Sequence, residues 1–380
     1  MAKAGGELAS WALLASAAVV LALQPMACNG PDTDTDDSGI DLGPALAGVG
    51  PNVVLPTLTR FDAEMTSLQT ATVAWSDALD AGGDGVAERA AAQEAWASAM
   101  AVWQQAELLQ IGPGGSTPSV VGALDLRDEV YSWPSVNPCR IDQEVAEGNW
   151  DDADFYAANE VNSYGLDAIE YLLWADPDNA CPGQVPPNDD GAWDALGPAG
   201  VTGARAAFAV QLSTGVLDQN DALIGHWEGD FGVAFATGSD PYASDLEALN
   251  AIFDALFYLE LTTKDRKLLS EFEAQPSGTS ARWIDANLAG FELLFAGADG
   301  AGLDDVLRDV GQGELVDSVM SALADARQAA AANDVALESL DPVELAALYE
   351  AVKAVTDLLK GDVATTLTLQ IPGEAAGDND

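Results

Sequence analysis

The chain of 380 residues carries 14 lysine and arginine residues against 62 aspartate and glutamate residues, a formal net charge of −48 at pH 7. This excludes nucleic acids as general partners and anionic lipid head groups as a docking surface, because both are bound by clustered basic side chains. Hydrophobic residues make up 48% of the chain and include 10 tryptophans, so the sequence can still build a core.

The N-terminus is predicted to be a signal peptide over residues 1–27. Lys3 precedes an apolar run from Leu8 to Leu23, which is typical of a secretory signal and short for a membrane span. An alanine and Cys28 follow, and bacterial lipoprotein precursors are cut and lipidated at such a junction. We therefore expect a lipid on Cys28. The alternative is a signal anchor that stays in place.

Residues 28–55 are predicted to be the lipidated cysteine and a disordered acidic tether. The run 32–39 is polar, acidic and without periodicity. Its alternating aspartates resemble a calcium loop, but Asp37 and Gly43 stand where an EF-hand requires glycine and glutamate. We expect an outer-membrane lipoprotein that faces the periplasm or the cell surface and touches the membrane only through its lipid.

From residue 60 onward, apolar residues recur at spacings of three and four, which predicts an all-α fold. Helices are predicted over 59–80, 85–110, 122–132, 139–147, 151–174, 201–225, 242–272, 278–296, 302–309, 314–333 and 341–361. A loop rich in proline, glycine and aspartate at 176–200 predicts a boundary between a first helical bundle (56–190) and a second (200–365). The run 365–370 predicts an isolated strand or an extended tail, and residues 366–380 are assigned to a tail.

The cysteines agree with export. Once Cys28 is lipidated, Cys139 and Cys181 remain as an even pair in a chain sent to an oxidising compartment. We expect these two residues to form a disulfide.

The single histidine, His226, excludes many enzyme classes. An HExxH zinc peptidase helix is impossible, and no GxSxG turn accompanies the histidine to form a serine hydrolase triad. The glycines at 112–115 are not followed by lysine and so form no phosphate loop. His226 itself is expected to be a hydrogen-bonding or capping residue, with metal ligation as the alternative.

Three carboxylates stand where core residues are expected. Glu107 continues the apolar stripe that ends in Trp103, and Glu170 lies within the apolar arc of the predicted helix 151–174, with Asp167 at its margin. A buried carboxylate must be paired, protonated or bound to a metal. The alternative is a solvated acidic face.

Five sequence blocks carry a family resemblance. They are Trp96 to Pro113, Arg127 to Pro134, Gly165 to Trp174, Leu249 to Leu268 and Ser277 to Phe295. Together and in this order they resemble the imelysin family over residues 60–365. The resemblance implies a bacterial envelope protein of two helical bundles. The family was first described as metallopeptidases and is more often linked to iron uptake or metal binding.

The family signature is G-x-H-x-x-E, near the interface of the two halves, and here it begins at Gly165 and has Asp167 in place of the histidine. The resemblance implies that Asp167 and Glu170 are metal ligands, with Glu107 as a third. It further implies that Arg127 neutralises surplus carboxylate charge. Two carboxylates suit hard ions such as Fe(III), Ca, Mg or Mn, whereas imidazole suits Zn, Cu and Fe(II).

Trp103 and Trp133 are expected beside these ligands. The sequence therefore predicts an envelope-anchored, imelysin-like lipoprotein that binds a metal ion between its bundles, with iron favoured by the resemblance and with iron-uptake proteins of the envelope as partners. The first alternative is a metallopeptidase in which Glu170 activates a metal-bound water, which the missing histidine argues against. The second is a non-catalytic scaffold with a degenerate site.

Overall fold

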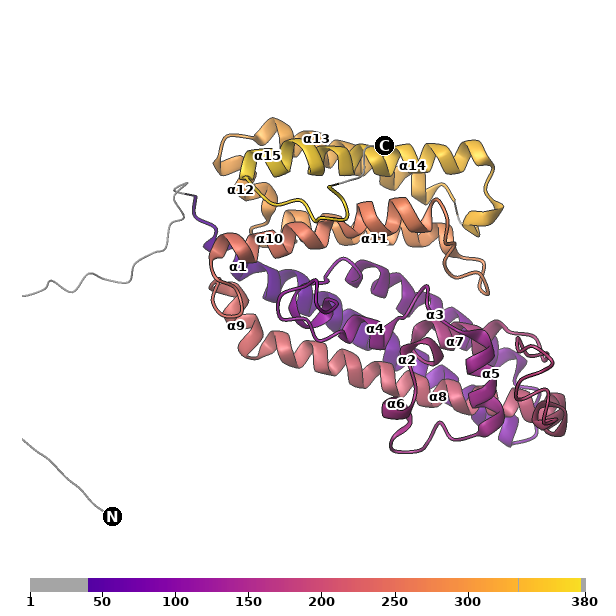
Figure 1. Cartoon of the computed structure of the whole chain (residues 1–380). Helices are drawn as coiled ribbons and strands as arrows, with labels where there is room; N and C mark the ends of the chain where they lie inside the picture. Colours follow the sequence, from indigo (N-terminus) through magenta and orange to yellow (C-terminus); the bar gives the residue numbers. More distant parts are fainter. Residues whose placement is uncertain (1–39, 334, 377–380) are drawn as a thin grey trace, which may run out of the picture. The chain divides into compact units, whose positions relative to one another are not determined.

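A computed structural model describes residues 40–333 and 335–376 of the chain. This part is built from helices and contains no strand, which confirms the predicted all-α fold (Figure 1). None of its helices is both long enough and apolar enough to cross a membrane. The predicted signal peptide, Cys28 and residues 29–39 of the predicted tether lie outside the described residues.

Helices of different types follow one another along the chain. The first α-helices are α1 (Gly43–Gly48), α2 (Leu55–Asp80), α3 (Val86–Ala106), α4 (Leu126–Val130), α5 (Pro138–Glu147), α6 (Phe155–Ala158) and α7 (Leu166–Trp174). The later ones are α8 (Ala192–Glu228), α9 (Asp230–Ala236), α10 (Asp245–Leu256), α11 (Ser280–Ala296), α12 (Leu303–Asp309), α13 (Gly313–Ala331), α14 (Pro342–Leu358) and α15 (Ala364–Leu367). Three segments are π-helical, η1 (Val49–Val54), η4 (Leu259–Lys267) and η6 (Leu359–Val363), and three are short 3-10 helices, η2 (Gly112–Gly114), η3 (Val161–Ser163) and η5 (Leu337–Ser339).

Helix α2 packs along both α3 and α8. It buries Phe61, Met65, Leu68 and Trp75, whose spacings of three, four and seven place them on one side of the helix. Helix α8 begins at Ala192, inside the loop predicted at 176–200, and contacts a helix that precedes that loop. The division of the chain into bundles at 176–200 stays a prediction.

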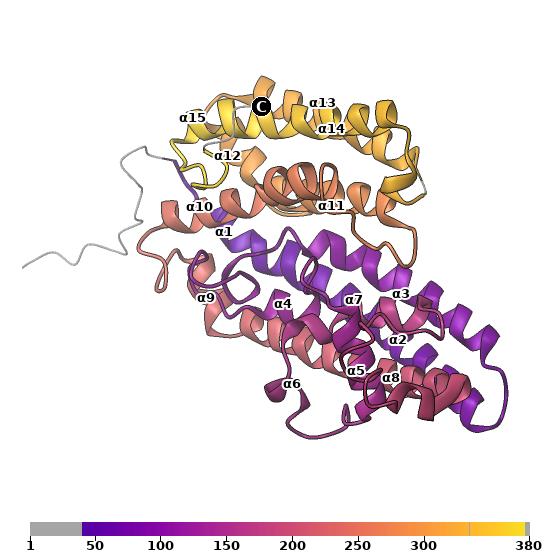
Figure 2. The same cartoon turned by 45° about the vertical axis from the view of Figure 1, so that its right-hand side comes forward.

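Helix α3, which contacts α2, also contacts α11. Helix α11 in turn contacts α13, and α13 packs against α14 (Figures 1 and 2). The approach of α11 to α3 depends on Gly290. A Cβ atom there would lie 2.5 Å from the backbone oxygen of Gln105, closer than real Cβ atoms come to any neighbour. Glycine therefore sets the distance between these two helices.

Four other features differ from the sequence predictions. Helices α1 and η1 occupy residues that we expected in the tether, because apolar side chains at spacings of three and four are buried there; these are Ala45, Leu46, Val49 and Val53. The predicted helix 151–174 is divided into α6, η3 and α7, and the predicted helix 242–272 into α10 and η4. The strand predicted at 365–370 is wrong, because α15 covers its start and buries Leu367.

Candidate functional site

Helix α7 carries the two signature carboxylates into the interior. It begins after Gly165, whose φ of 94° is left-handed, and a Cβ atom there would lie 2.9 Å from the backbone oxygen of Val130. Asp167 lies in the first turn and Glu170 one turn later, with exposed fractions of 4% and 3%. Their burial excludes the alternative of a solvated acidic face.

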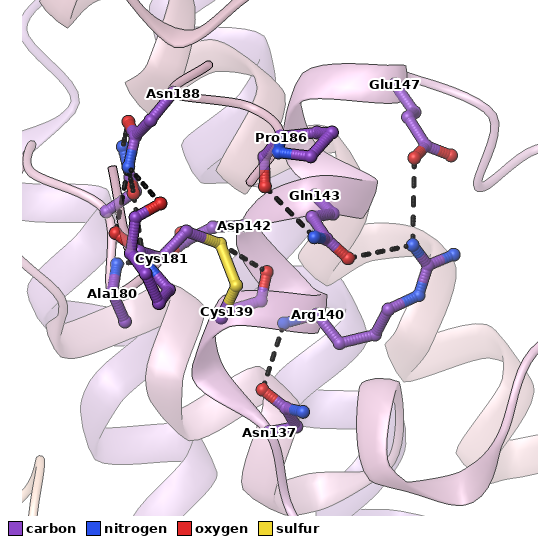
Figure 3. The surroundings of a disulfide bond; sticks show 12 residues. Asn137, Cys139, Arg140, Asp142, Gln143, Glu147, Ala180, Cys181, Pro186 and Asn188 are labelled. Carbon is purple, nitrogen blue, oxygen red and sulfur yellow. Dashed lines mark hydrogen bonds and ion pairs between the residues drawn. A yellow bond between two sulfur atoms is a disulfide. The ribbon is translucent and has the colours of Figure 1, made fainter. Parts of the chain in front are cut away.

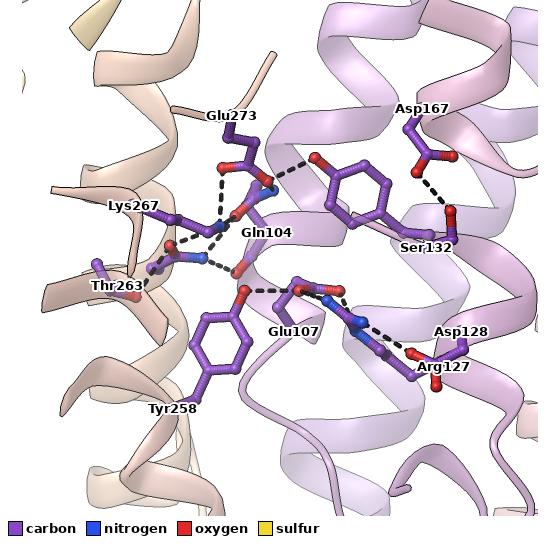
Figure 4. A network of polar contacts seen from close by, with 12 residues as sticks. Gln104, Glu107, Arg127, Asp128, Ser132, Asp167, Tyr258, Thr263, Lys267 and Glu273 are labelled. Carbon is purple, nitrogen blue, oxygen red and sulfur yellow. Dashed lines mark hydrogen bonds and ion pairs between the residues drawn. The ribbon is translucent and has the colours of Figure 1, made fainter. Parts of the chain in front are cut away.

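Asp167 is held by hydrogen bonds from neutral donors. The hydroxyl of Ser132 donates to Oδ2 at 2.8 Å, and the backbone N–H of Ala168 donates to Oδ1 at 3.0 Å (Figure 4). Burial nevertheless raises the pKa of Asp167 to about 7, because these hydrogen bonds offset only part of the lost hydration.

Glu170 has a similar environment. Its Oε1 accepts a hydrogen bond of 2.9 Å from the backbone N–H of Ser277, in the segment before α11. Burial raises the pKa of Glu170 to about 8, and the charges of Glu273 and Asp167 add to this rise. Neither Asp167 nor Glu170 has an ion-pair partner among the described residues.

Glu107 is buried as well, but it is paired. Arg127 reaches it with two N–H groups, from Nε to Oε1 at 3.1 Å and from Nη2 to Oε2 at 2.8 Å, and the hydroxyl of Tyr258 donates to Oε2 at 2.6 Å (Figure 4). Burial acts to raise the pKa of Glu107, but Arg127 outweighs it and the net shift is downward. Arg127 therefore pairs with Glu107 and, through Nη1 at 2.8 Å, with Oδ1 of the adjacent Asp128.

A second buried ion pair, between Lys267 and Glu273, was not among the sequence predictions. The Lys267 ammonium lies 2.8 Å from Oε2 of Glu273, and both side chains are fully buried. The hydroxyl of Tyr131 donates to Oε1 of Glu273 at 2.6 Å. Burial raises the pKa of Tyr131 well above its ordinary value, and the charges of Glu273, Asp167 and Glu170 contribute, so this phenol lies within electrostatic reach of all three acids.

The two predicted tryptophans have different neighbours. Trp133 packs against the lysine, with its ring centre 5.5 Å from the Lys267 ammonium. Trp103 packs against Phe61 with the ring centres 4.9 Å apart and the ring planes tilted by 43°, and with Arg127 it lines a cavity of about 20 Å³. In the sequence, Lys267 lies inside the predicted helix 242–272, and this position was the one sign that it could face other helices.

Within the part of the chain that the structure describes, no group of three or more His, Cys, Asp or Glu could hold a metal ion. The predicted set of Asp167, Glu170 and Glu107 is therefore not assembled as a three-carboxylate site, because Glu107 is occupied by Arg127. His226 is exposed in the last turn of α8 and is not among the contacts of these acids. The oxygen donors left for a cation are those of Asp167 and Glu170.

The predicted disulfide between Cys139 and Cys181 is confirmed (Figure 3). It joins the first turn of α5 to the loop that follows α7. Asp142 of α5 holds the same loop, because it accepts a 2.8 Å hydrogen bond from the backbone N–H of Ala180.

Comparison with known proteins identifies the family of this chain. The sequence model described as Imelysin, Peptidase_M75, matches residues 54–363. The chain belongs to the imelysin family. Its place in the family makes the aspartate at position 167 a departure from the G-x-H-x-x-E signature. A comparison with curated proteins finds no match.

Two solved structures resemble this imelysin-family chain. One is an imelysin-like protein from Psychrobacter arcticum 273-4, with a TM-score of 0.60 and 18% identity over 87% of this chain and 98% of that one. The other is described as an iron-regulated protein A precursor from Parabacteroides distasonis ATCC 8503, with a TM-score of 0.61 and 15% identity over 86% and 95% of the two chains. At these identities the likeness shows a shared fold.

Proposed function

We propose that this chain is a binding protein of the cell envelope that holds one metal ion, or a ligand carrying a metal ion, through Asp167 and Glu170. The observation that carries the proposal is that these two buried carboxylates, one helical turn apart, have no cation paired with them. Two neighbouring buried acids must take up protons or a cation. A cation that binds here would replace those protons.

The carboxylate oxygens of Asp167 and Glu170 are donors that hard cations prefer. Carboxylate oxygens suit Fe(III), Ca, Mg or Mn, and iron is favoured because the second structural relative is described as iron-regulated. Two carboxylates supply fewer ligands than such ions require. The ion would therefore keep water or the donors of its own chelating ligand, which favours a metal-linked ligand over a closed metal site.

The surrounding residues of this chain orient the two acids. The hydroxyl of Ser132 fixes Asp167, and the backbone N–H of Ser277 fixes Glu170 from the segment before α11. A bound ion supplies positive charge, and the acids would lose their protons as it enters. Export through residues 1–27, a lipid on Cys28 and contact with iron-uptake proteins complete the proposal.

A metallopeptidase is the less favoured alternative. It would require Glu170, which the proposal uses as a metal ligand, to accept a proton from a metal-bound water. The signature histidine is also missing. Turnover of a peptide library with and without chelator tests this alternative directly.

The proposal is tested by calorimetric titration of chelator-treated protein with Fe(III) citrate, Fe(II), Zn, Mn and Ca. We expect the wild type to bind one hard ion, Glu170→Gln to lose that binding, and Asp167→His to shift the preference toward Zn or Fe(II). Glu94→Gln, an exposed glutamate on α3, is the matched control and should bind as the wild type does. If the wild type binds no ion more tightly than Glu170→Gln, the chain is a scaffold with a degenerate site.

A further inference from the structure

The ammonium of Lys267 lies in a cage of three oxygen atoms. These are Oε2 of Glu273 at 2.8 Å, Oε1 of Gln104 at 2.6 Å and Oδ1 of Asn287 at 3.1 Å (Figure 4). Gln104 and Asn287 accept hydrogen bonds from the ammonium, and Glu273 balances its charge as an ion-pair partner. The rings of Trp133 and Tyr258 lie over the same ammonium, each with its centre 5.5 Å away.

The cage is assembled from separate elements and is held in place without the lysine. Gln104 lies on α3, Asn287 on α11, and Glu273 in the segment between η4 and α11. The amide of Asn287 donates to the backbone oxygen of Gln104 at 2.8 Å, which leaves its Oδ1 directed at the ammonium. The hydroxyl of Tyr131 fixes the far oxygen of Glu273. Oxygen atoms and aromatic faces arranged in this way form a site for a small monovalent cation.

We propose that the Lys267 ammonium is the resident cation of this interface, because it fills a cage that would otherwise bind a small primary ammonium ion. Its two amide acceptors come from α3 and α11 and its carboxylate partner from the segment between η4 and α11, so the ammonium joins three parts of the chain.

The first test asks whether a free cation can replace the side chain. Lys267→Ala removes three carbons and the nitrogen, which n-propylammonium matches in size and charge. Melting temperatures are measured in chelator, with n-propylammonium, with tetramethylammonium, which is too broad for the cage, and with neutral n-propanol. We expect Lys267→Ala to melt about 5–10 °C below the wild type, as for a broken buried ion pair. We expect n-propylammonium alone to restore at least half of that loss.

Lys353→Ala is the matched control, because its ammonium bonds Asp357 at the surface, and n-propylammonium should not change its melting temperature. If n-propylammonium restores Lys267→Ala no better than n-propanol does, the cage is not a cation site and the inference is wrong. If Lys267→Ala is unfolded alone, folding that appears on addition of n-propylammonium supports the inference, and failure to fold with it overturns the inference.

The second test concerns charge. Lys267→Met keeps the bulk of the side chain and should destabilise the protein, whereas the double variant Lys267→Met/Glu273→Gln removes both charges and should recover most of the loss. A double variant as unstable as Lys267→Met would contradict the role of Lys267 as the partner of Glu273.

Discussion

Replacing Glu170 with glutamine should stabilise the metal-free protein, by an amount that grows with pH. The pKa of Glu170 rises from an ordinary value of 4.5 to about 8 in the folded state. Between these values the folded state holds a proton that the unfolded chain has lost, so the free energy of unfolding of the wild type falls as pH rises. Glutamine has no such proton and can still accept the hydrogen bond from Ser277.

The size of the effect follows from the pKa difference. Glu170→Gln should exceed the wild type in unfolding free energy by about 3 kcal/mol at pH 7, since each pKa unit is worth about 1.4 kcal/mol. At pH 4 the two proteins should be nearly equal, because the acid is then protonated in both states. Below the unfolded pKa the wild type therefore has its full stability, and it loses that stability as pH rises through the folded pKa.

Urea unfolding in chelator at several values between pH 4 and pH 9 measures the difference. Glu94→Gln, on the exposed side of α3, controls for the loss of one negative charge from an acidic protein and should show a small offset that does not depend on pH. A difference for Glu170→Gln that stays constant across the range, or a variant less stable than the wild type at pH 8, would refute the reasoning.

Four further predictions concern other features of the chain. Arg127→Met leaves Glu107 buried without its partner and should lower the unfolding free energy by about 3–5 kcal/mol, most of which the double variant Arg127→Met/Glu107→Gln should recover in urea unfolding. Replacing Cys139 and Cys181 by serine should lower it by about 4 kcal/mol, because the closed loop spans 42 residues, and a loss below 1 kcal/mol would contradict the loop-closure argument. The melting temperature should rise from low salt to about 1 M, where the Debye length is about 3 Å, unless bound cations already neutralise the surface. Mass spectrometry of the membrane fraction should find a mature chain that begins at lipid-modified Cys28, and a soluble chain with another start would refute the anchor.

Much of the fold was predictable because it depends on local periodicity. The spacing of apolar residues located the main helices, and the same spacing placed Glu107 and Glu170 in the interior. The breaks were harder to predict. Nothing in the segment around Leu256 and Leu259 resembles a helix end, and the change from α10 to π-helical η4 depends on packing against other elements.

The polar pairing was not predictable from spacing. Glu107 and its partner Tyr258 are 151 residues apart, and Lys267 and Gln104 are 163 apart, so only the folded chain brings them together. A lysine is ordinarily expected at the surface, and Lys267 can be buried because two amide oxygens accept its hydrogen bonds and Glu273 balances its charge. The sequence identified the buried acids Glu107, Asp167 and Glu170, but it did not show which of them is paired with a cation.

The contacts of Lys267 depend on the identity of one uncharged residue, Gly290. It lies on α11 less than one turn beyond Asn287, and its missing side chain lets α11 approach α3 closely enough for Asn287 to reach Gln104. A single methyl group at this position would separate the two helices and withdraw an oxygen from the lysine. Related chains can therefore gain or lose the charged centre through a substitution at a position that bears no charge and contacts no ligand.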